Sequence, residues 1–393
     1  MLRIVRLEAR GAEQAPLVGG KAAALAALMR AGCQVPPGFA ITTGAYLEHL
    51  EHNHLRTPIE GLLAHCASLE AQQRAADDIR GLFEASRLTP ALEDEVLAAY
   101  ERLCQVARVP TGADQTAPRP AACPVAVRSS ATAEDRADAS FAGQQETYLW
   151  IIGGQEVLRH IVRCWASLFT PQALAYRAQR LQATPTNLAM GVVVQQMVPA
   201  QTAGVMLTID PTTGDRSSIL IEAAPGLGAT VVNGEVTPDR VYVDKVLLEI
   251  RSRSIGVKHV AYRFDPSLQG IRLEVVPAEQ QVQACLTDAE SIRLARLGKH
   301  LEQAMGRPQD VEWAIGPGPA GPREIYLLQA RPETVWSQKP PPAPAEAGST
   351  VMERILRTLG HAQAQSSSTS ASTGASPVSD SASGRANVAA KRW

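Results

Sequence analysis

The sequence predicts a mixed α/β (α+β) protein, on three observations. Short apolar or alternating runs typical of strands recur along the chain, and longer Ala- and Leu-rich segments with helical spacing separate them. Glycine and proline clusters mark the boundaries. The 393 residues suggest two or three domains, and a hydrophobic content of 45% is enough for substantial cores.

Composition excludes several functional classes. The 38 Lys and Arg residues balance 39 Asp and Glu residues, so no overall field attracts nucleic acid or an anionic membrane. The N-terminus lacks an apolar signal core, and no apolar run approaches the length of a membrane span. The six cysteines form no C-x-x-C pair, which argues against a disulfide framework or a zinc site. We therefore expect a cytoplasmic protein in a reducing compartment.

The first elements surround a pair of glycines. An alternating strand is predicted at 2–7, and an Ala- and Leu-rich helix is predicted at 22–30. Gly19, Gly20 and Lys21 precede this helix, so free N–H groups, the helix dipole and an ammonium group converge there. This is a candidate phosphate cradle, although the same triplet is common in ordinary turns. A strand or extended segment follows at 39–43.

Residues 44–107 are predicted to be helical, followed by an exposed linker at 110–124. His49, His52 and His54 lie close together in the helical part. Their spacing of three and then two residues does not keep all three on one helical face. We therefore predict solvated residues at a helix end rather than a metal site.

The most informative stretch runs from residue 125 to residue 148 and reads VAVRSSATAEDRADASFAGQQETY. Val125–Val127 is predicted to be a buried strand, with Arg128 at its tip. A hydroxyl cluster of Ser129, Ser130 and Thr132 follows, and Ala142 and Gly143 form a small-residue turn. A guanidinium beside hydroxyls and flexible backbone suits a polyphosphate, because arginine grips two oxygens at once. The alternative is a surface loop with an ordinary arginine–aspartate pair.

The middle of the chain alternates between helix and strand. The segment AMGVVVQQMV at 189–198 is predicted to be an interior strand. Its end, at Gln195, Met197 and Val198, resembles a hinge whose backbone contacts a flat base, although a plain core strand explains it equally well. Helices are predicted at 155–180 and 287–305, strands at 204–209, 218–223 and 241–243, a turn at 210–215, and strand-like alternation at 246–276.

Two strands near residue 310 carry a candidate metal site. Strands are predicted at 309–315 and 325–328, joined by the exposed connection GPGPAGP at 316–322. Asp310 and Glu312 are two residues apart and share a face of the first strand, and Gln329 and Arg331 share a face of the second strand in the same way. Carboxylate and amide oxygens suit magnesium. The alternative is a cross-strand salt bridge between Glu312 and Arg331.

The tail from residue 337 is low in complexity. Thr350 and Glu353 form a capping-box pattern before an apolar stripe, so a short helix is predicted at 350–360. It is either a docking peptide or a frayed remnant.

Together these segments resemble the nucleotide-binding part of the phosphoenolpyruvate synthase and pyruvate phosphate dikinase family. The resemblance covers roughly residues 1–335 and rests on an ordered series: LVGGKAAALAALMRAGCQVPPGFAITTGAY, VAVRSSATAEDRADASFAGQQETYL, CWASLFTPQALAYR, VVVQQMVPAQTAGVMLTIDPTTGDR, EAAPGLGATVVNGEVTPDRVYVDK, DVEW and YLLQARPET. The series is far more specific than any one member.

The resemblance implies an ATP-grasp-like module of two α/β lobes that clasp MgATP, with lobes at 1–188 and 189–336 and a tail at 337–393. By resemblance, the phosphates lie against Lys21, Arg128 and Arg331. Gly143 and Thr147 would line the nucleotide, and Gln195, Met197 and Val198 would contact adenine. Glu312 and Gln329 would hold magnesium, with Asp310 nearby.

Two residues depart from the family pattern. Ala22 follows the GGK lysine where the family usually has glycine, and Ala229 follows GLG where it usually has an acid. The second departure puts tight nucleotide binding in doubt.

Family enzymes continue into a domain whose histidine carries the phosphoryl group, and then into a substrate-binding barrel. Nothing of that size follows residue 336, and His361 lies in the low-complexity tail. We therefore expect an ATP-binding subunit whose acceptor histidine and substrate-binding domain lie on a separate protein. Phenylphosphate synthase has such a stand-alone subunit, so phenol and pyruvate are the candidate substrates. The rival hypothesis is a non-catalytic nucleotide sensor or assembly protein.

Overall fold

The structure is a computed structural model that describes residues 2–66, 68–106, 122–132, 146–180, 189–265, 270–318 and 321–336. Several predictions lie outside these residues. They concern most of the linker at 110–124, the turn at Gly143, and the tail with its helix at 350–360 and His361.

The first sheet is antiparallel throughout, with the spatial order β1-β2-β5-β3-β4. The three inner strands β2, β5 and β3 are buried over almost their whole length. The strands are β1 (Ile4–Arg6), β2 (Gly38–Ile41), β3 (Val125–Ala131), β4 (Thr147–Ile151) and β5 (Met190–Gln196).

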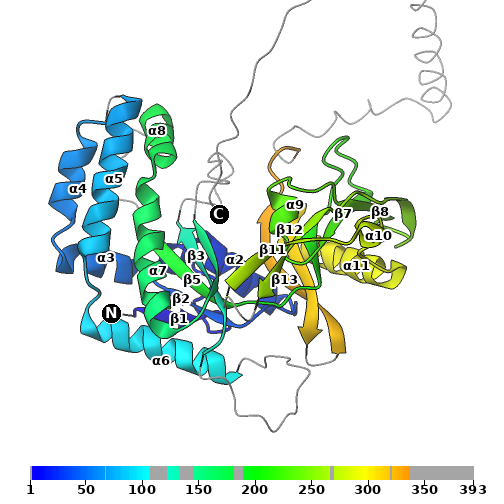
Figure 1. Ribbon diagram of the computed structural model, residues 1–393, viewed down its shortest axis with the longest axis horizontal. Helices are drawn as coiled ribbons and strands as arrows, with labels where there is room; N and C mark the ends of the chain where they lie inside the picture. Colours follow the sequence, from blue (N-terminus) through cyan, green and yellow to red (C-terminus); the bar gives the residue numbers. More distant parts are fainter. Residues whose placement is uncertain are drawn as a thin grey trace, which may run out of the picture. The chain divides into compact units, whose positions relative to one another are not determined.

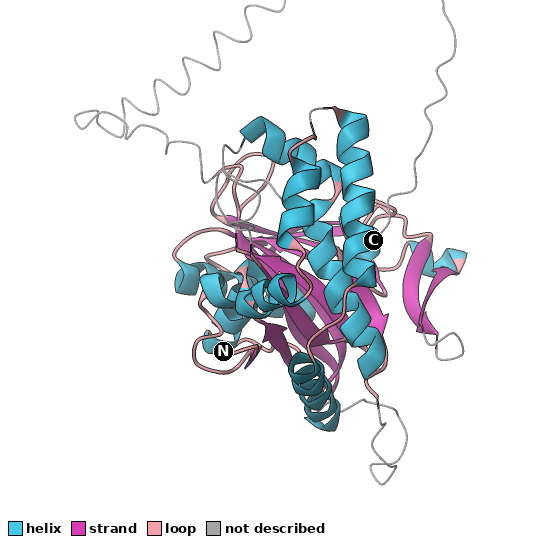
Figure 2. Cartoon of the chain, turned by 90° about the vertical axis from the view of Figure 1, so that its left-hand side faces the viewer, coloured by secondary structure: helices cyan, strands magenta, loops and turns pink. Residues whose placement is uncertain are grey.

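Helices cover one face of this sheet (Figures 1 and 2). Val127 of β3 lies in the same core as Ile161 and Trp165, which the apolar stripe of α7 turns inward. The helical layer consists of α3 (Thr43–His52), α4 (Arg56–Leu63), α5 (Leu69–Ala85), α6 (Pro90–Val106), α7 (Gly154–Ala166), the 3-10 turn η1 (Ser167–Phe169) and α8 (Pro171–Arg180).

The second sheet is also antiparallel, in the order β13-β12-β6-β7-β8-β9. Helix α11 packs on it, beginning at a capping box of Thr287 and Glu290 and ending at the left-handed Gly306. The elements are β6 (Thr202–Leu207), β7 (Ser218–Pro225), α9 (Ala229–Val232), β8 (Asp239–Asp244), β9 (Ile250–Ser254), α10 (Ala278–Gln281), α11 (Asp288–Met305), β12 (Gln309–Gly318) and β13 (Gly321–Pro332).

Helix α2 (Gly20–Arg30) lies between the two sheets, directly after the single turn α1 (Ala15–Val18). It contacts β3 and β5 of the first sheet and β13 of the second. Its Leu25 and Leu28 are buried in one core with Val193 of β5 and with Trp313 and Leu327 of the second sheet. The hydrophobic contact between the sheets therefore runs through this helix.

A two-stranded hairpin of β10 (Val260–Asp265) and β11 (Gly270–Val275) gives a further contact with the first sheet. The Phe264 ring of β10 stacks on the Trp150 indole of β4, with the ring centroids 4.1 Å apart and the planes at 11°. Trp150 is in the left-handed region at φ 58°, which is unfavourable for a bulky residue. The stack holds the hairpin against β4.

Most predicted elements are confirmed, with two changes in boundaries. Strand β3 continues to Ala131, so the prediction that Arg128 lies at the strand tip was wrong: this residue is in the strand interior. The predicted exposed connection at 316–322 is partly strand, because β12 extends to Gly318 and β13 begins at Gly321. Over the part of the chain that the structure describes, no helix has the length and apolarity to cross a membrane.

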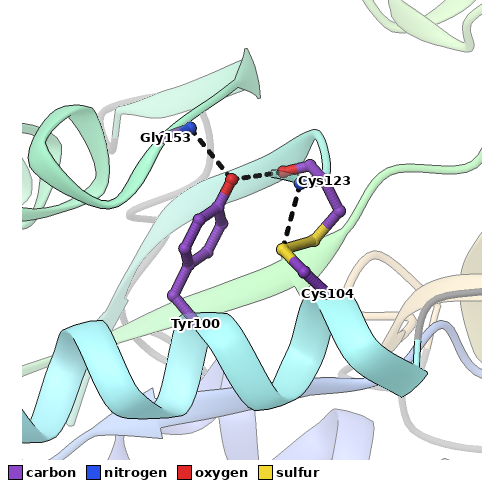
Figure 3. The surroundings of a disulfide bond; sticks show 4 residues. All are labelled: Tyr100, Cys104, Cys123 and Gly153. Atoms are coloured by element: carbon purple, nitrogen blue, oxygen red, sulfur yellow. Dashed lines mark hydrogen bonds between the residues drawn. A yellow bond between two sulfur atoms is a disulfide. The ribbon is translucent and has the colours of Figure 1, made fainter. Parts of the chain in front are cut away.

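The cysteine pattern argued against a disulfide framework, and the structure contains one disulfide among the described residues. Cys104 at the end of α6 forms a disulfide with Cys123, just before β3 (Figure 3). The Tyr100 hydroxyl donates to the Cys123 carbonyl at 2.7 Å and accepts from the Gly153 N–H at 2.9 Å. Sequence spacing did not indicate this pair, since α6 and β3 meet only in the folded protein.

The three neighbouring histidines do not share one environment. His49 is buried against Phe83 and Trp165, whereas His52 is exposed, so the prediction of solvated residues fails for His49. Ser86 donates its hydroxyl proton to the Phe83 carbonyl and so accepts from His49 Nε2, while Asn53 donates to Nδ1. This arrangement fits the neutral imidazole. No group of three or more metal-ligating His, Cys, Asp or Glu residues occurs within the described ranges.

Burial, aided by the charge of His52, lowers the pKa of His49 to about 4. The unfolded chain therefore binds a proton that the folded protein excludes as the pH falls from about 6.5 to about 4. Stability is thus fully present above this window and is lost on acidification, by up to about 3 kcal/mol. We expect His49→Phe, which does not titrate, to lose correspondingly less unfolding free energy than the wild type between pH 7 and pH 4 in urea titrations.

The exposed neighbour on the same helix provides the control, and His52→Gln should keep most of the wild-type pH dependence. If the unfolding free energies of the wild type and of His49→Phe changed equally between pH 7 and pH 4, the neutral buried state of His49 would be contradicted.

Candidate functional site

Arg128 is the side chain that connects the two sheets at the candidate site. It belongs to β3, yet its guanidinium reaches β12 and β13 and is largely buried. Its Nη1 donates to the Leu328 carbonyl at 3.0 Å, and its Nη2 lies 2.5 Å from Gln329 Oε1 and 3.4 Å from Glu312 Oε2. The predicted phosphate-binding arginine therefore lies directly against the two predicted metal ligands.

A bulge in β13 creates this arrangement. Glu312 of β12 is opposite Gln329, whereas the next pair is Trp313 with Leu327, so Leu328 is the extra residue. A bulged residue leaves the regular ladder, which makes its carbonyl available to another donor. Arg128 uses the Leu328 carbonyl in this way.

Asp310 and Arg331 form a cross-strand pair two positions from Glu312 and Gln329 along the same hairpin. Arg331 Nη2 lies 2.8 Å from Asp310 Oδ2, and Arg331 Nε donates to the same oxygen at 2.9 Å. Burial raises the pKa of Asp310, and the Arg331 charge opposes that shift. In this register Arg331 faces Asp310, so the cross-strand salt bridge forms with Asp310 rather than with Glu312.

Lys21 lies in the first turn of α2, and that turn is pressed against β3. Gly19, at φ 81°, precedes the helix, and a Cβ there would be 1.7 Å from the Ser130 carbonyl oxygen. The Ala22 N–H donates to Ser130 Oγ at 3.1 Å. The backbone that carries Lys21 thus touches the strand that carries Arg128, two residues from that arginine.

Two of the predicted nucleotide-lining residues belong to strands of the first sheet, Thr147 to β4 and Gln195 to β5, whereas Met197 and Val198 follow β5. Thr147 of β4 is opposite Arg128 in the register of the first sheet. In the predicted adenine segment, Gln195 Nε2 donates to the Pro36 carbonyl and the Met197 N–H donates to the Pro124 carbonyl. Val198 is buried in a small cluster with Ala203 and Ala314. Adenine binding by this segment stays a prediction.

These groups have the chemistry that a site for a polyanion together with a hard cation would use. Asp310, Glu312 and Gln329 provide oxygen ligands, and Arg128 and Arg331 provide positive charge among them. Arg128 Nε is a buried donor for which the described residues supply no partner. An unsatisfied buried donor is costly unless an acceptor arrives, so this atom fits an anionic ligand.

Comparison with known proteins identifies the family. Residues 15–350 match the family model described as "Pyruvate phosphate dikinase, AMP/ATP-binding domain". The chain belongs to this family.

Relatives with similar sequences are named as phosphoenolpyruvate synthases. The protein from Aeropyrum pernix is 38% identical, and the match covers 84% of this chain and 42% of that protein. For the probable phosphoenolpyruvate synthase of Staphylothermus marinus, the identity is 37%, over 92% of this chain and 44% of the relative. The phosphoenolpyruvate synthase of Aquifex aeolicus is also 37% identical, and the match covers 83% of this chain and 39% of that protein. The chain therefore spans less than half the length of these relatives.

Two contributors to the site were not assigned from the sequence. One is the Leu328 carbonyl, because a bulge depends on strand register and leaves no residue signature. The other is the Ser130 hydroxyl, which was counted only as part of a polar cluster. Its spacing of two from Arg128 was a usable signal, since such residues share one face of a strand.

The close approach of Gly19 to β3 gives a testable prediction. Gly19→Ala should lower the unfolding free energy by about 3 kcal/mol or more, because unfavourable φ and a clash with fixed backbone add together. Gly153→Ala is the matched control, since Gly153 has φ 96° but no described atom lies within 4 Å of the position that its Cβ would take. Gly153→Ala should lower the unfolding free energy by about 1–2 kcal/mol, because only its backbone dihedral angle is unfavourable. If chemical denaturation showed that Gly19→Ala and Gly153→Ala lose the same unfolding free energy, the tight contact between α2 and β3 would be contradicted.

Proposed function

We propose that this chain binds MgATP between its two sheets, in an ATP-grasp-like manner, as the nucleotide-binding part of a phosphoenolpyruvate synthase-like phosphotransferase. The observation that carries the proposal is the contact of Arg128 from the first sheet with Glu312 and Gln329 from the second. Membership of an AMP/ATP-binding domain family supports the choice of nucleotide. The Lys21 turn packed beside Arg128 supports a site for phosphates.

The residues fit magnesium. Glu312 and Gln329 would hold the ion, with Asp310 nearby, and all three offer the oxygen ligands that magnesium prefers. One or two carboxylates are enough, because magnesium takes its remaining ligands from phosphates and water. When bound, the ion would neutralise phosphate charge during transfer.

The chain's own cations complete the charge balance. Lys21, Arg128 and Arg331 would orient the phosphates and stabilise the charge that spreads over the transferred group. By analogy with the family, the transferred group passes to a histidine of a partner protein, leaving AMP and phosphate. Its final acceptor would be pyruvate, as in the synthases to which this chain is similar, or a phenol, as in phenylphosphate synthase.

Nucleotide binding is the first test of the site. Lys21→Ala and Arg128→Ala should each weaken MgATP binding at least about tenfold, because each removes a charge-assisted phosphate contact. Calorimetric titration of the isolated chain measures this without any partner. Arg30→Ala, at the far end of α2 and paired with Glu13, is the control and should bind MgATP like the wild type. Normal binding by Arg128→Ala would remove Arg128 from the site.

The metal site gives a separate prediction. Because Arg128 Nη2 contacts both Glu312 and Gln329, a metal ion and the guanidinium compete for the same oxygens. We expect Arg128→Ala to bind Mn²⁺ without nucleotide several-fold more tightly than the wild type does, as measured by electron paramagnetic resonance. Removing the positive charge of Arg128 also makes binding of the metal ion more favourable by about 1 kcal/mol or more. Glu312→Gln in the same background should abolish the gain. Unchanged Mn²⁺ affinity in Arg128→Ala would exclude these oxygens as shared ligands.

Phosphoryl transfer should require an acceptor held in line with the transferred phosphorus. With ATP radioactive in its β-phosphate, a partner that contains a phosphohistidine domain should acquire acid-labile label, and AMP should accumulate. The chain alone should form little AMP. Labelling of this chain itself would place the acceptor on it.

The same measurement addresses the rival function. A nucleotide sensor or assembly protein would bind MgATP yet form no AMP and label no candidate partner. The replacement of the usual acid by Ala229, at the start of α9, is the one observation that favours this alternative.

A further inference from the structure

The first turn of α2 lacks a capping side chain of its own. The residue before the helix is Gly19, which has no side chain, and the first helical residue is Gly20. The opening N–H groups of a helix have no partner within it and need an outside acceptor. The acceptor for Ala22 N–H is Ser130 Oγ, which comes from a strand 108 positions further along the chain.

Ser130 is completely buried, and its contact with the α2 turn has two parts. Its hydroxyl accepts from the Ala22 amide, and its backbone leaves no space for a Cβ at Gly19. The carbonyl of Val18, just before this turn, is similarly close to Gly191 of β5. The turn is therefore fixed against β3 and β5, two neighbouring inner strands of the first sheet.

Ser130 and Arg128 lie two residues apart on β3 and so share a face of the sheet. That face is the one toward α2, since Val127 and Ala131 belong to the core on the helical side. Lys21 directly precedes Ala22, whose backbone N–H donates to the Ser130 hydroxyl. One strand thus carries Arg128 and also holds the backbone from which Lys21 extends.

Ser130 matters locally rather than for the whole helix. Beyond its first turn, α2 is held by Leu25 and Leu28 in the core between the sheets. The turn itself begins with two glycines, which have more backbone freedom than any other residue. Without the Ser130 hydroxyl, the helix remains packed and the backbone contacts at Gly19 and Gly191 remain, but the Ala22 amide loses its acceptor and the first turn, including Lys21, is held less firmly.

We propose that Ser130 is a positioning residue that fixes the Lys21 ammonium relative to the Arg128 guanidinium by capping α2 through the Ala22 amide. The inference rests on the proposed function in that both cations face ATP phosphates. Ser130 itself touches no phosphate.

A double-mutant cycle on MgATP binding tests this role. Ser130→Ala should weaken binding about five- to tenfold, the effect expected for loss of one helix cap. In a Lys21→Met background the same substitution should change binding less than twofold, because the side chain through which Ser130 acts is gone. Ser130→Cys, which keeps the shape of the side chain at a slightly larger size but accepts hydrogen bonds weakly, should behave as Ser130→Ala does and serves if the alanine variant does not fold.

Ser129→Ala is the matched control. Ser129 is equally buried on the neighbouring position, but its hydroxyl donates to the Glu146 carbonyl. This variant should bind MgATP within twofold of the wild type. Amide hydrogen exchange gives a second readout, in which Ser130→Ala should speed exchange at residues 20–23 and leave 25–30 protected.

Three results would overturn the proposal: MgATP binding by Ser130→Ala within twofold of the wild type, a five- to tenfold loss that persists in the Lys21→Met background, or unchanged exchange at residues 20–23. Absence of MgATP binding by the wild type is a different outcome, since it would contradict the proposed function itself.

Discussion

The burial of α2 between two antiparallel sheets is the constraint on which the rest of the structure depends. The helix supplies apolar side chains to a core that includes strands of both sheets, and its N-terminal turn touches β3 closely enough to exclude any Cβ at Gly19. Because close-packed interiors accommodate little change in shape, the position of this helix fixes the distance between β3 and β13. The reach of Arg128 from one sheet to the other depends on that distance.

The second requirement is an irregularity in a regular sheet. The bulge at Leu328 breaks the ladder between β12 and β13 and turns a carbonyl toward Arg128, while Glu312 and Gln329 remain opposite each other. The site therefore combines one irregular strand with one arginine that arrives from elsewhere in the chain.

Much of this arrangement could be predicted from the sequence, because strand and helix periodicity are local properties. Periodicity placed most elements, and the alternation around Asp310 and Glu312 identified a carboxylate-bearing strand before any fold was known. Three features could not be predicted, since each depends on contacts between distant segments. These are the extension of β3 past Arg128, which follows from pairing with β5, the disulfide between Cys104 and Cys123, and the burial of His49. A charged residue at the end of an apolar run indicates a strand end only when no second strand continues to pair with it.

The order of strands in the first sheet also has a consequence for synthesis of the chain. Strand β2 is synthesised early, yet one of its neighbours in the sheet is β5, which comes much later in the sequence. Helix α2 likewise packs against β13, which lies near the end of the described residues. As the chain leaves the ribosome, the apolar surface of α2 and the open edge of β2 remain uncovered until these late strands emerge. Pairings between distant segments slow folding, and uncovered strand edges favour association with other chains. Nascent chains of this protein therefore have a long interval in which the N-terminal segment is exposed, before their own later strands cover it.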